Sequence, residues 1–220
     1  MVSVRLSAIS YAMLKGKRRI LSFANSFLNE RISSLQKDVL TCIVNTCPFP
    51  AILYCFATID LLAALYIGTG TSKAAIRGGR TVGITEFSMQ YMQQMMGYAK
   101  FDIELLQDIF RHKTVHLAQP KLVLERSRPK RKIGWMLYNY SSTKHLTLDP
   151  LGKENEVKTI VTPEPMYYNH IFSVSVQSLM EDIRDSVYRS QTGYLALLER
   201  SKARRERFAR SVDQIFSMKT

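Results

Sequence analysis

Residues 101–120 read FDIELLQDIFRHKTVHLAQP and carry a helical pattern of apolar residues. This pattern predicts one amphipathic helix that packs one face against a core. We expect Asp102 to cap its start and Pro120 to end it, because the residue before a proline avoids the helical conformation. The polar side chains of its last turns are Arg111, His112, Lys113 and His116. If the chain performs chemistry, we expect it at these residues.

A chain of 220 residues suffices for one core with an insertion. With 46% hydrophobic and 22% charged residues, its composition is globular, which excludes an intrinsically disordered protein. The 31 Lys and Arg residues outnumber the 18 Asp and Glu residues, so the formal net charge is +13. This surplus favours a polyanionic partner, either nucleic acid or an anionic membrane surface.

The first 22 residues are basic and contain no acid, and their order of charged and apolar residues does not match a secretory signal peptide. We expect residues 1–22 to form a loosely ordered basic arm. The chain has three cysteines without a CxxC pair, Cys42, Cys47 and Cys55. We expect these thiols to be reduced, to pack in the core and to bind no zinc, as in a cytoplasmic protein.

Two helices are expected before residue 70, at 25–45 and 50–68. The second segment, PAILYCFATIDLLAALYIG, is the most apolar part of the chain and is long enough to suggest a membrane span. Asp60 at its centre costs about 2.5–3.5 kcal/mol on membrane-insertion scales, so we expect a helix buried in a soluble bundle instead. Asp60 is then a buried carboxylate that needs a cation or several donors. An arginine or histidine of residues 101–120 is the expected partner.

Residues 68–83, GTGTSKAAIRGGRTVG, are expected to form a turn-rich loop. The segment is not a P-loop, because it lacks the GK[ST] ending and follows a helix instead of a strand. Its cations either contact a phosphate backbone or are simply solvated. These cations are Lys73, Arg77 and Arg80. Residues 85–99 are expected to form a helix whose methionine-rich face serves either core packing or a dimer surface.

The hydrophobic period changes after Pro120, and alternating apolar residues predict four short strands, the last near 157–161. We expect an antiparallel β-meander at 121–169, inserted into a helical bundle formed by 23–120 and 170–220. Cations of its first turn are candidate nucleic-acid contacts. They are Arg128, Lys130 and Arg131. The basic run near the C-terminus is either a solvated helix face or an RNA-binding ridge.

Four interpretations fit the cluster at 111–116. Its side chains satisfy the carbonyl groups of a helix C-terminus; His112 and His116 bind a metal ion; the cluster binds nucleic acid without catalysis; or it belongs to a metal-independent ribonuclease. The sequence lacks an HExxH pattern and a nearby acidic or cysteine third ligand, which disfavours the metal ion. We therefore expect no metal and no other cofactor.

The sequence FRHKTVH resembles the Arg-polar-x-x-x-His signature of the HEPN superfamily (higher eukaryotes and prokaryotes nucleotide-binding domain). Arg111 and His116 match the two signature residues, and His112 matches the polar position. HEPN domains are helical bundles, often dimeric, that occur in toxin–antitoxin, phage-defence and RNA-cleaving systems. The resemblance covers about residues 25–118 and the last helices, and it implies RNA, a second copy of the chain and an antitoxin-like protein as partners.

We therefore predict a mainly helical α+β fold, an HEPN-like bundle with a small inserted antiparallel sheet. The predicted function is that of an RNA-directed, metal-independent endoribonuclease in the cytoplasm. His116 is expected to take the proton of a ribose 2′-OH, and Arg111 to hold the charge that develops on the phosphate. His112, Lys113 and Asp60 are expected to support them. The alternative is a non-catalytic nucleic-acid-binding or protein-interaction module whose Arg/His cluster is structural.

Overall fold

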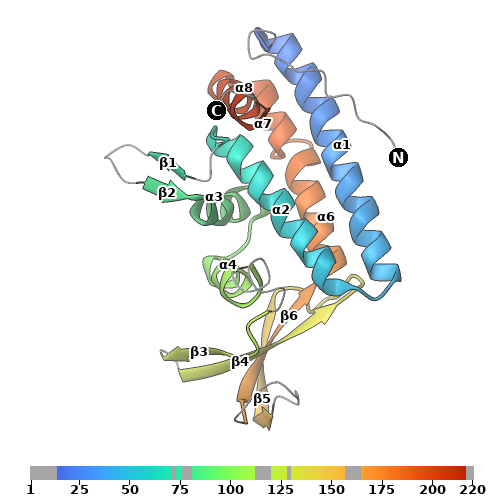
Figure 1. The fold of residues 1–220 in the computed structure, drawn as a ribbon, viewed down its shortest axis with the longest axis vertical. Helices are drawn as coiled ribbons and strands as arrows, with labels where there is room; N and C mark the ends of the chain where they lie inside the picture. The colour runs from blue at the N-terminus through green and yellow to red at the C-terminus, as the bar shows by residue number, and fades with distance from the viewer. Residues whose placement is uncertain are drawn as a thin grey trace. The chain divides into compact units, whose positions relative to one another are not determined.

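The computed structural model describes residues 14–70, 73–75, 81–111, 120–127, 130–156 and 165–216 (Figure 1). It confirms a mainly helical α+β fold. The chain divides into two compact units. Unit 1 comprises Met1–Ser33, Thr58–Gly97 and Arg184–Thr220, and unit 2 comprises Ser34–Ala57 and Tyr98–Ile183. Helices α1, α2 and α6 each contribute residues to both units.

Helix α1 (Lys17–Val44) begins inside the segment predicted as a loose arm. Its first turns are helical because Ile20 continues the buried stripe of Ala24 and Phe27 at helical spacing. Gly16 precedes the helix with φ of +89°, a left-handed conformation that suits glycine. The earlier part of the predicted arm, residues 1–13, lies outside the described residues.

Helix α2 (Pro48–Ile67) confirms the predicted apolar helix. It ends at Gly68, where φ is +94° and a Cβ atom would lie 2.7 Å from Cβ of Arg207, so that only glycine fits. Within the described residues, α2 is the helix long and apolar enough to cross a membrane. More than half of its most apolar stretch is buried inside the structure, as in the core helix of a soluble protein. Cys55 of α2 is buried as predicted, whereas Cys47 is exposed.

Unit 1 contains a short two-stranded ribbon where a loop without strands was predicted. Strand β1 (Lys73–Ala75) pairs antiparallel with β2 (Thr81–Gly83). Helix α3 (Ile84–Tyr91) then runs into the π-helix η2 (Met92–Met96), which ends at Gly97 as the sequence indicates. The methionines at both ends of η2 are buried, in agreement with core packing.

The rest of unit 1 surrounds an aromatic core. Tyr66 contacts Tyr91 and Tyr194 with ring centroids 5.8 and 6.0 Å apart, and Tyr194 contacts Phe208 at 6.4 Å. The last two rings belong to α7 (Tyr194–Arg200) and α8 (Lys202–Phe216). The C-terminal helices α7 and α8 are therefore part of this core.

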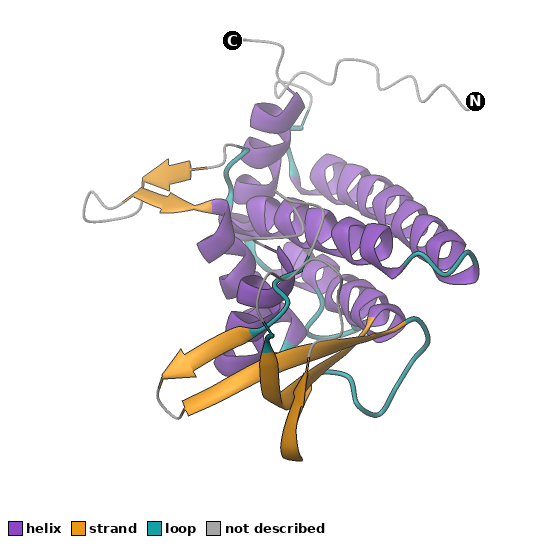
Figure 2. Cartoon of the chain, turned by 60° about the horizontal axis from the view of Figure 1, so that its bottom comes forward, coloured by secondary structure: helices purple, strands orange, loops and turns teal. Residues whose placement is uncertain are grey.

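Unit 2 contains a four-stranded sheet in the order β3-β4-β6-β5 (Figure 2). Its strands are β3 (Leu124–Ser127), β4 (Lys130–Tyr138), β5 (Thr147–Glu156) and β6 (Tyr167–Ser175). Strand β4 pairs in parallel with β6 and antiparallel with β3, so the sheet is mixed and the prediction of an antiparallel meander was wrong. The predicted strand near 157–161 lies outside the described residues.

Strand β6 was missed because it runs directly into α6. It is an inner strand between β4 and β5, and its second half is buried, with Phe172 and Val174 inaccessible to solvent. These apolar residues alternate with Ser173 and Ser175, but the helical pattern begins immediately after them, so residues from 170 onward were assigned to the helical bundle. Helix α6 (Val176–Tyr188) follows it directly, and the Ser175 hydroxyl caps that helix by accepting the Ser178 N–H at 3.0 Å.

Helix α4 (Lys100–Leu105) and the π-helix η3 (Leu106–Arg111) form the described part of the predicted helix 101–120. Ala99 occupies the N-cap position without a side-chain cap, so Asp102 lies in the first turn and the predicted cap was wrong. Phe110 of η3 packs edge-on against Trp135 of β4, with ring centroids 5.7 Å apart. This contact joins the end of η3 to the sheet.

Candidate functional site

The last turns of η3 carry two polar side chains on a buried surface. Gln107 is 2% exposed and Arg111 is 8% exposed, while Ile109 and Phe110 between them are fully buried. Both amide atoms of Gln107 are buried without a hydrogen-bond partner in the described part of the chain. Residues four apart lie on the same side of a helix, so Gln107 and Arg111 are neighbours. Unsatisfied buried groups and π-helical turns are both concentrated at functional sites.

The chain re-enters the described residues beside the same helix end. The N–H of Lys121 donates to the carbonyl oxygen of Ile109 at 2.8 Å, and Nε1 of Trp135 donates to the carbonyl oxygen of Lys121 at 2.8 Å. Both backbone groups of Lys121 are thus held, one by η3 and one by β4. Lys121 is therefore held beside Ile109, two residues before Arg111.

Three of the predicted site residues, His112, Lys113 and His116, belong to segment 112–119 and lie outside the described residues. Arg111 is the member of the predicted catalytic pair whose position the structure gives. It was expected to lie clear of the apolar stripe, and the structure corrects this, since its side chain is buried among apolar neighbours. Gln107 was not singled out from the sequence; the signal was a polar residue inside an apolar helical stripe.

Asp60 lies in α2, in the part that belongs to unit 1. It is half-buried, so the prediction of full burial was wrong, because α2 presents Asp60 at the edge of the buried face that Ile59 and Ala63 occupy. The hydroxyl of Ser88 in α3, which is fully buried, donates a hydrogen bond to its carboxylate. This contact gives Asp60 one donor, which comes from α3 and not from the expected segment 101–120.

Arg126 of β3 binds the acidic side of the α4–η3 segment. Its guanidinium lies 2.7 Å from the carboxylate of Asp108 and 3.9 Å from that of Glu104. Each of these side chains is about one third exposed, so the ion pairs are partly screened by solvent. Their clearest consequence is geometric, because they fix the edge of the sheet against the helix that ends at Arg111.

Two of the six candidate nucleic-acid contacts have a described side chain. Lys130 is exposed at the start of β4, and the guanidinium of Arg131 lies over the ring of Phe101, 5.9 Å from its centroid. Arg77, Arg80 and Arg128 lie outside the described residues, and Lys73 is described by its backbone alone. Lys130 is therefore the candidate that presents its charge to solvent.

Several arginines of the basic C-terminal run have structural roles in unit 1. Arg204 donates to the carbonyl oxygen of Tyr66 at 3.1 Å, and Arg210 donates to that of Gly68 at 3.1 Å, so both satisfy the C-terminal end of α2. Arg205 donates to the carbonyl oxygens of Leu198 and Glu199 at the end of α7. For these three residues, helix capping explains the positive charge without RNA.

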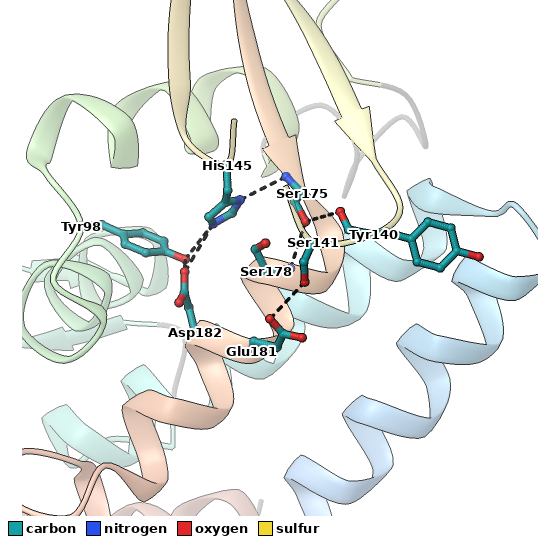
Figure 3. A network of polar contacts seen from close by, with 8 residues as sticks. All are labelled: Tyr98, Tyr140, Ser141, His145, Ser175, Ser178, Glu181 and Asp182. Carbon is teal, nitrogen blue, oxygen red and sulfur yellow. Dashed lines mark hydrogen bonds and ion pairs between the residues drawn. The ribbon is translucent and has the colours of Figure 1, made fainter. Parts of the chain in front are cut away.

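A second polar cluster in unit 2 surrounds His145, which the sequence did not single out (Figure 3). Nε2 of His145 lies 3.3 Å from the hydroxyl of Tyr98 and 3.4 Å from the carboxylate of Asp182, and the Tyr98 hydroxyl donates to Asp182 at 2.6 Å. Nδ1 of His145 accepts the backbone N–H of Ser175 at 3.1 Å, which places the ring hydrogen on Nε2. The three side chains come from separate segments of the sequence.

The cluster holds the β4–β5 connection against α6. Burial and the neighbouring Asp182 carboxylate raise the pKa of Tyr98, which therefore stays a hydrogen-bond donor. Ser141 of the same connection donates to Glu181 of α6 at 3.2 Å (Figure 3). Because these bonds connect the β4–β5 connection to α6 and to the end of β6, we assign the cluster a structural role.

Among the described residues, no group of three His, Cys, Asp or Glu side chains is placed to hold a metal ion. No family model, no curated protein and no solved structure matches this chain.

Proposed function

We propose that this chain is an HEPN-like, RNA-directed endoribonuclease that works without a metal, with Arg111 and His116 as its catalytic pair. The observation that carries the proposal is the end of η3. There the buried Arg111 lies on the same helix side as Gln107, whose amide is unsatisfied among the described residues, and Lys121 donates to the carbonyl oxygen of Ile109. In the sequence, His116 lies between Arg111 and Lys121, which is the basis for assigning it to the same site.

In the proposed reaction, His116 takes the proton of a ribose 2′-OH, whose oxygen attacks the adjacent phosphorus. The new 2′-O–P bond forms as the bond to the 5′-oxygen breaks, which leaves a 2′,3′-cyclic phosphate and a 5′-hydroxyl end after protonation. Arg111 stabilises the negative charge on the phosphate oxygens with two parallel N–H donors. Lys113 and His112 contribute to phosphate binding. DNA lacks the 2′-OH, so it is bound without cleavage.

The low exposure of Arg111 favours one second candidate, a non-catalytic module that binds RNA or a protein. In that case, Arg111 acts as a buried structural residue at a helix end. Both candidates are proposed to be cytoplasmic, with a second copy of the chain and an antitoxin-like protein as partners, and the RNA-binding form of the second candidate shares the RNA partner as well. They differ only in whether the end of η3 performs chemistry.

The deciding experiment measures cleavage of a structured RNA in EDTA by wild type, Arg111→Lys and His116→Asn. Lys keeps the charge and most of the length of Arg111 but loses the two-pronged donor geometry, so folding is retained while cleavage falls. A general base contributes about 10²–10⁴-fold, and His116→Asn should lose a factor of this size. His112→Asn is the comparison variant and should lose less cleavage than His116→Asn, because His112 contributes to phosphate binding only.

The products of wild type should carry 2′,3′-cyclic phosphate ends, and DNA of the same sequence should remain intact. Wild type that leaves every RNA uncut in EDTA would refute the ribonuclease proposal. If both variants fold and cleave at the wild-type rate, the assignment of Arg111 and His116 as the catalytic pair is refuted.

A further inference from the structure

A cavity of about 370 Å³ lies in unit 1 between the first residues of α1 and those of α8. Its floor is apolar and consists of Leu14, Ile20 and Ala209, which are all less than 8% exposed. Its wall is mostly cationic, with the lysines Lys15, Lys17 and Lys202 against the single acid Glu206. Arg205 also lines it, but its guanidinium is already engaged by the carbonyl oxygens of Leu198 and Glu199. The cavity thus combines an apolar surface with an excess of positive charge, a lining suited to an anion that carries an apolar part.

The two helices that border the cavity place cations at their positive ends. Neither α1 nor α8 has an acidic residue in its first turn. Instead α1 begins with Lys17, Arg18 and Arg19, and α8 begins with KARR at 202–205. The helix dipole disfavours cations near a helix N-terminus. The N-terminal ends of α1 and α8 therefore carry unfavourable charge repulsion in the isolated chain. An anion in the cavity relieves this repulsion at both ends together.

The acids of the region neutralise part of this charge. Lys17 lies 2.6 Å from the carboxylate of Glu199, and Lys202 lies 3.8 Å from that of Glu206. All four of these side chains are more than half exposed, so water screens the pairs and an incoming phosphate can compete for the lysines. Arg18 and Arg19, which follow Lys17 in the first turn of α1, add two further exposed cations next to the cavity lining in the sequence.

We infer that this cavity is a binding site for single-stranded RNA, which seats one phosphate on the cationic wall and the neighbouring base on the apolar floor. Unpaired bases are the parts of RNA that turn outward into protein pockets. Lys and Arg side chains and helix N-termini are common ligands of backbone phosphates. Arg18 and Arg19, exposed cations that are not part of the cavity lining, favour a polyanion over a single small anion. The inference rests on the proposed RNA partner but not on catalysis.

The test measures binding of a labelled single-stranded 2′-O-methyl oligonucleotide, in which the 2′-oxygen is blocked, so that a failure of the proposed ribonuclease does not affect the result. The double variant Lys15→Gln/Lys202→Gln removes two exposed cations of the cavity wall. It should bind about tenfold more weakly at 0.1 M salt. The slope of log Kobs against log salt should decrease in magnitude by about 0.7, the contribution of one lost phosphate contact.

Two further variants separate the site from general charge. Lys153→Gln removes an exposed lysine of β5 in unit 2 and should change the affinity by less than twofold. Ala209→Leu fills the floor of the cavity, and it should weaken binding while leaving the salt slope unchanged, because it excludes the base and keeps the cations.

Equal losses in the double variant and in Lys153→Gln would overturn the inference, since charge alone would then explain the binding. Ala209→Leu that folds and binds as wild type would also overturn it, because the cavity would then take no base. The last part of the test measures binding of the protein to vesicles that contain phosphatidylglycerol. If wild type binds them through Lys15 and Lys202 and leaves the oligonucleotide unbound, the surface is a membrane contact and the inference fails.

Discussion

At the scale of single residues, Gln107 is a buried polar side chain at a position where an apolar one would pack better. Its amide is buried in η3 without a partner in the described residues, although the surrounding positions are filled by apolar side chains. An unsatisfied buried amide costs about 1–3 kcal/mol, so a leucine of similar size would be better for stability alone. A polar residue at such a position therefore indicates a functional role in the candidate site at the end of η3.

Gln107→Leu should therefore raise the free energy of unfolding by about 1–2 kcal/mol and lower RNA cleavage. Chemical denaturation followed by circular dichroism measures the first effect, and the EDTA-resistant cleavage assay measures the second. Gln93→Leu is the matched control, since Gln93 is an exposed glutamine of the other π-helix, η2, and should change neither value. A destabilised Gln107→Leu would show that the amide is satisfied after all.

His170 of β6 gives a prediction that depends on pH. Burial, and then the positive charge of Arg131, lower the pKa of His170 below its ordinary value of about 6.5. The folded state therefore binds this proton less readily than the unfolded state, and stability is lost as the pH falls below about 6.5. Arg131→Gln should move the pKa of His170 upward in an NMR titration, whereas Lys153→Gln should leave it in place. An unchanged pKa in Arg131→Gln would show that burial alone causes the shift.

At the scale of elements, the C-terminal helix α8 acts as a cap for α2. The guanidinium of Arg204 lies 3.8 Å from the ring centroid of Tyr66 and donates to the hydroxyl of Tyr66 at 2.7 Å. The same hydroxyl donates to Gln94 at 2.6 Å, which links α8, α2 and η2 in one network. A run of arginines in a sequence usually marks a solvent-exposed helix face. In α8, Arg204 instead makes its contacts with Tyr66 of the protein itself.

Arg204→Ala should lower the free energy of unfolding by about 2–3 kcal/mol, because it removes a cation–π contact and two hydrogen bonds. Arg204→Lys should recover little of this loss, since an ammonium group cannot stack on the ring and bond both oxygens together. The exposed Arg207 on the same helix is the control, and Arg207→Ala should stay within about 0.5 kcal/mol of wild type. Equal urea midpoints for Arg204→Ala and Arg207→Ala would contradict the capping role.

Strand β4 positions the candidate site through one indole group. Trp135→Phe keeps an aromatic ring against Phe49 and Phe110 but removes the N–H that holds Lys121. The free energy of unfolding should fall by about 0.5–1.5 kcal/mol. RNA cleavage should fall by more than the fraction of unfolded protein accounts for, because the end of segment 112–119 is released. If cleavage falls only in proportion to the folded fraction, Lys121 has no role in positioning the candidate site.

At the scale of the whole molecule, helical periodicity predicted α1, α2 and α3, since each buries a stripe that can be read along the sequence. The boundaries were less predictable, because Ile20 extends α1 beyond the expected start and a π-helical turn changes the spacing after Leu105. The parallel pairing of β4 with β6 depends on residues far apart in the sequence, which local patterns do not record. The His145 cluster was missed for the same reason, since Tyr98, His145 and Asp182 meet only in the folded chain.

The apolar helix α2 leads to a prediction about the chain as a whole. Its length and composition would allow a membrane span, but more than half of its most apolar stretch is already buried by the protein. Insertion would also separate Asp60 from Ser88 and Tyr66 from Arg204, in addition to about 2.5–3.5 kcal/mol for a carboxylate at the membrane centre. The expressed chain should therefore remain in the supernatant after high-speed centrifugation without detergent.

The variant Asp60→Leu sharpens this test, because it removes the charge and makes α2 still more apolar. If packing inside the protein determines the location of α2, this variant should be less stable but should also stay in the supernatant. A wild-type chain that sediments with membranes and is released only by detergent would show that α2 spans the bilayer. Sedimentation of Asp60→Leu alone, as folded protein, would show that the charge of Asp60, and not the packing of α2, keeps the chain out of the membrane.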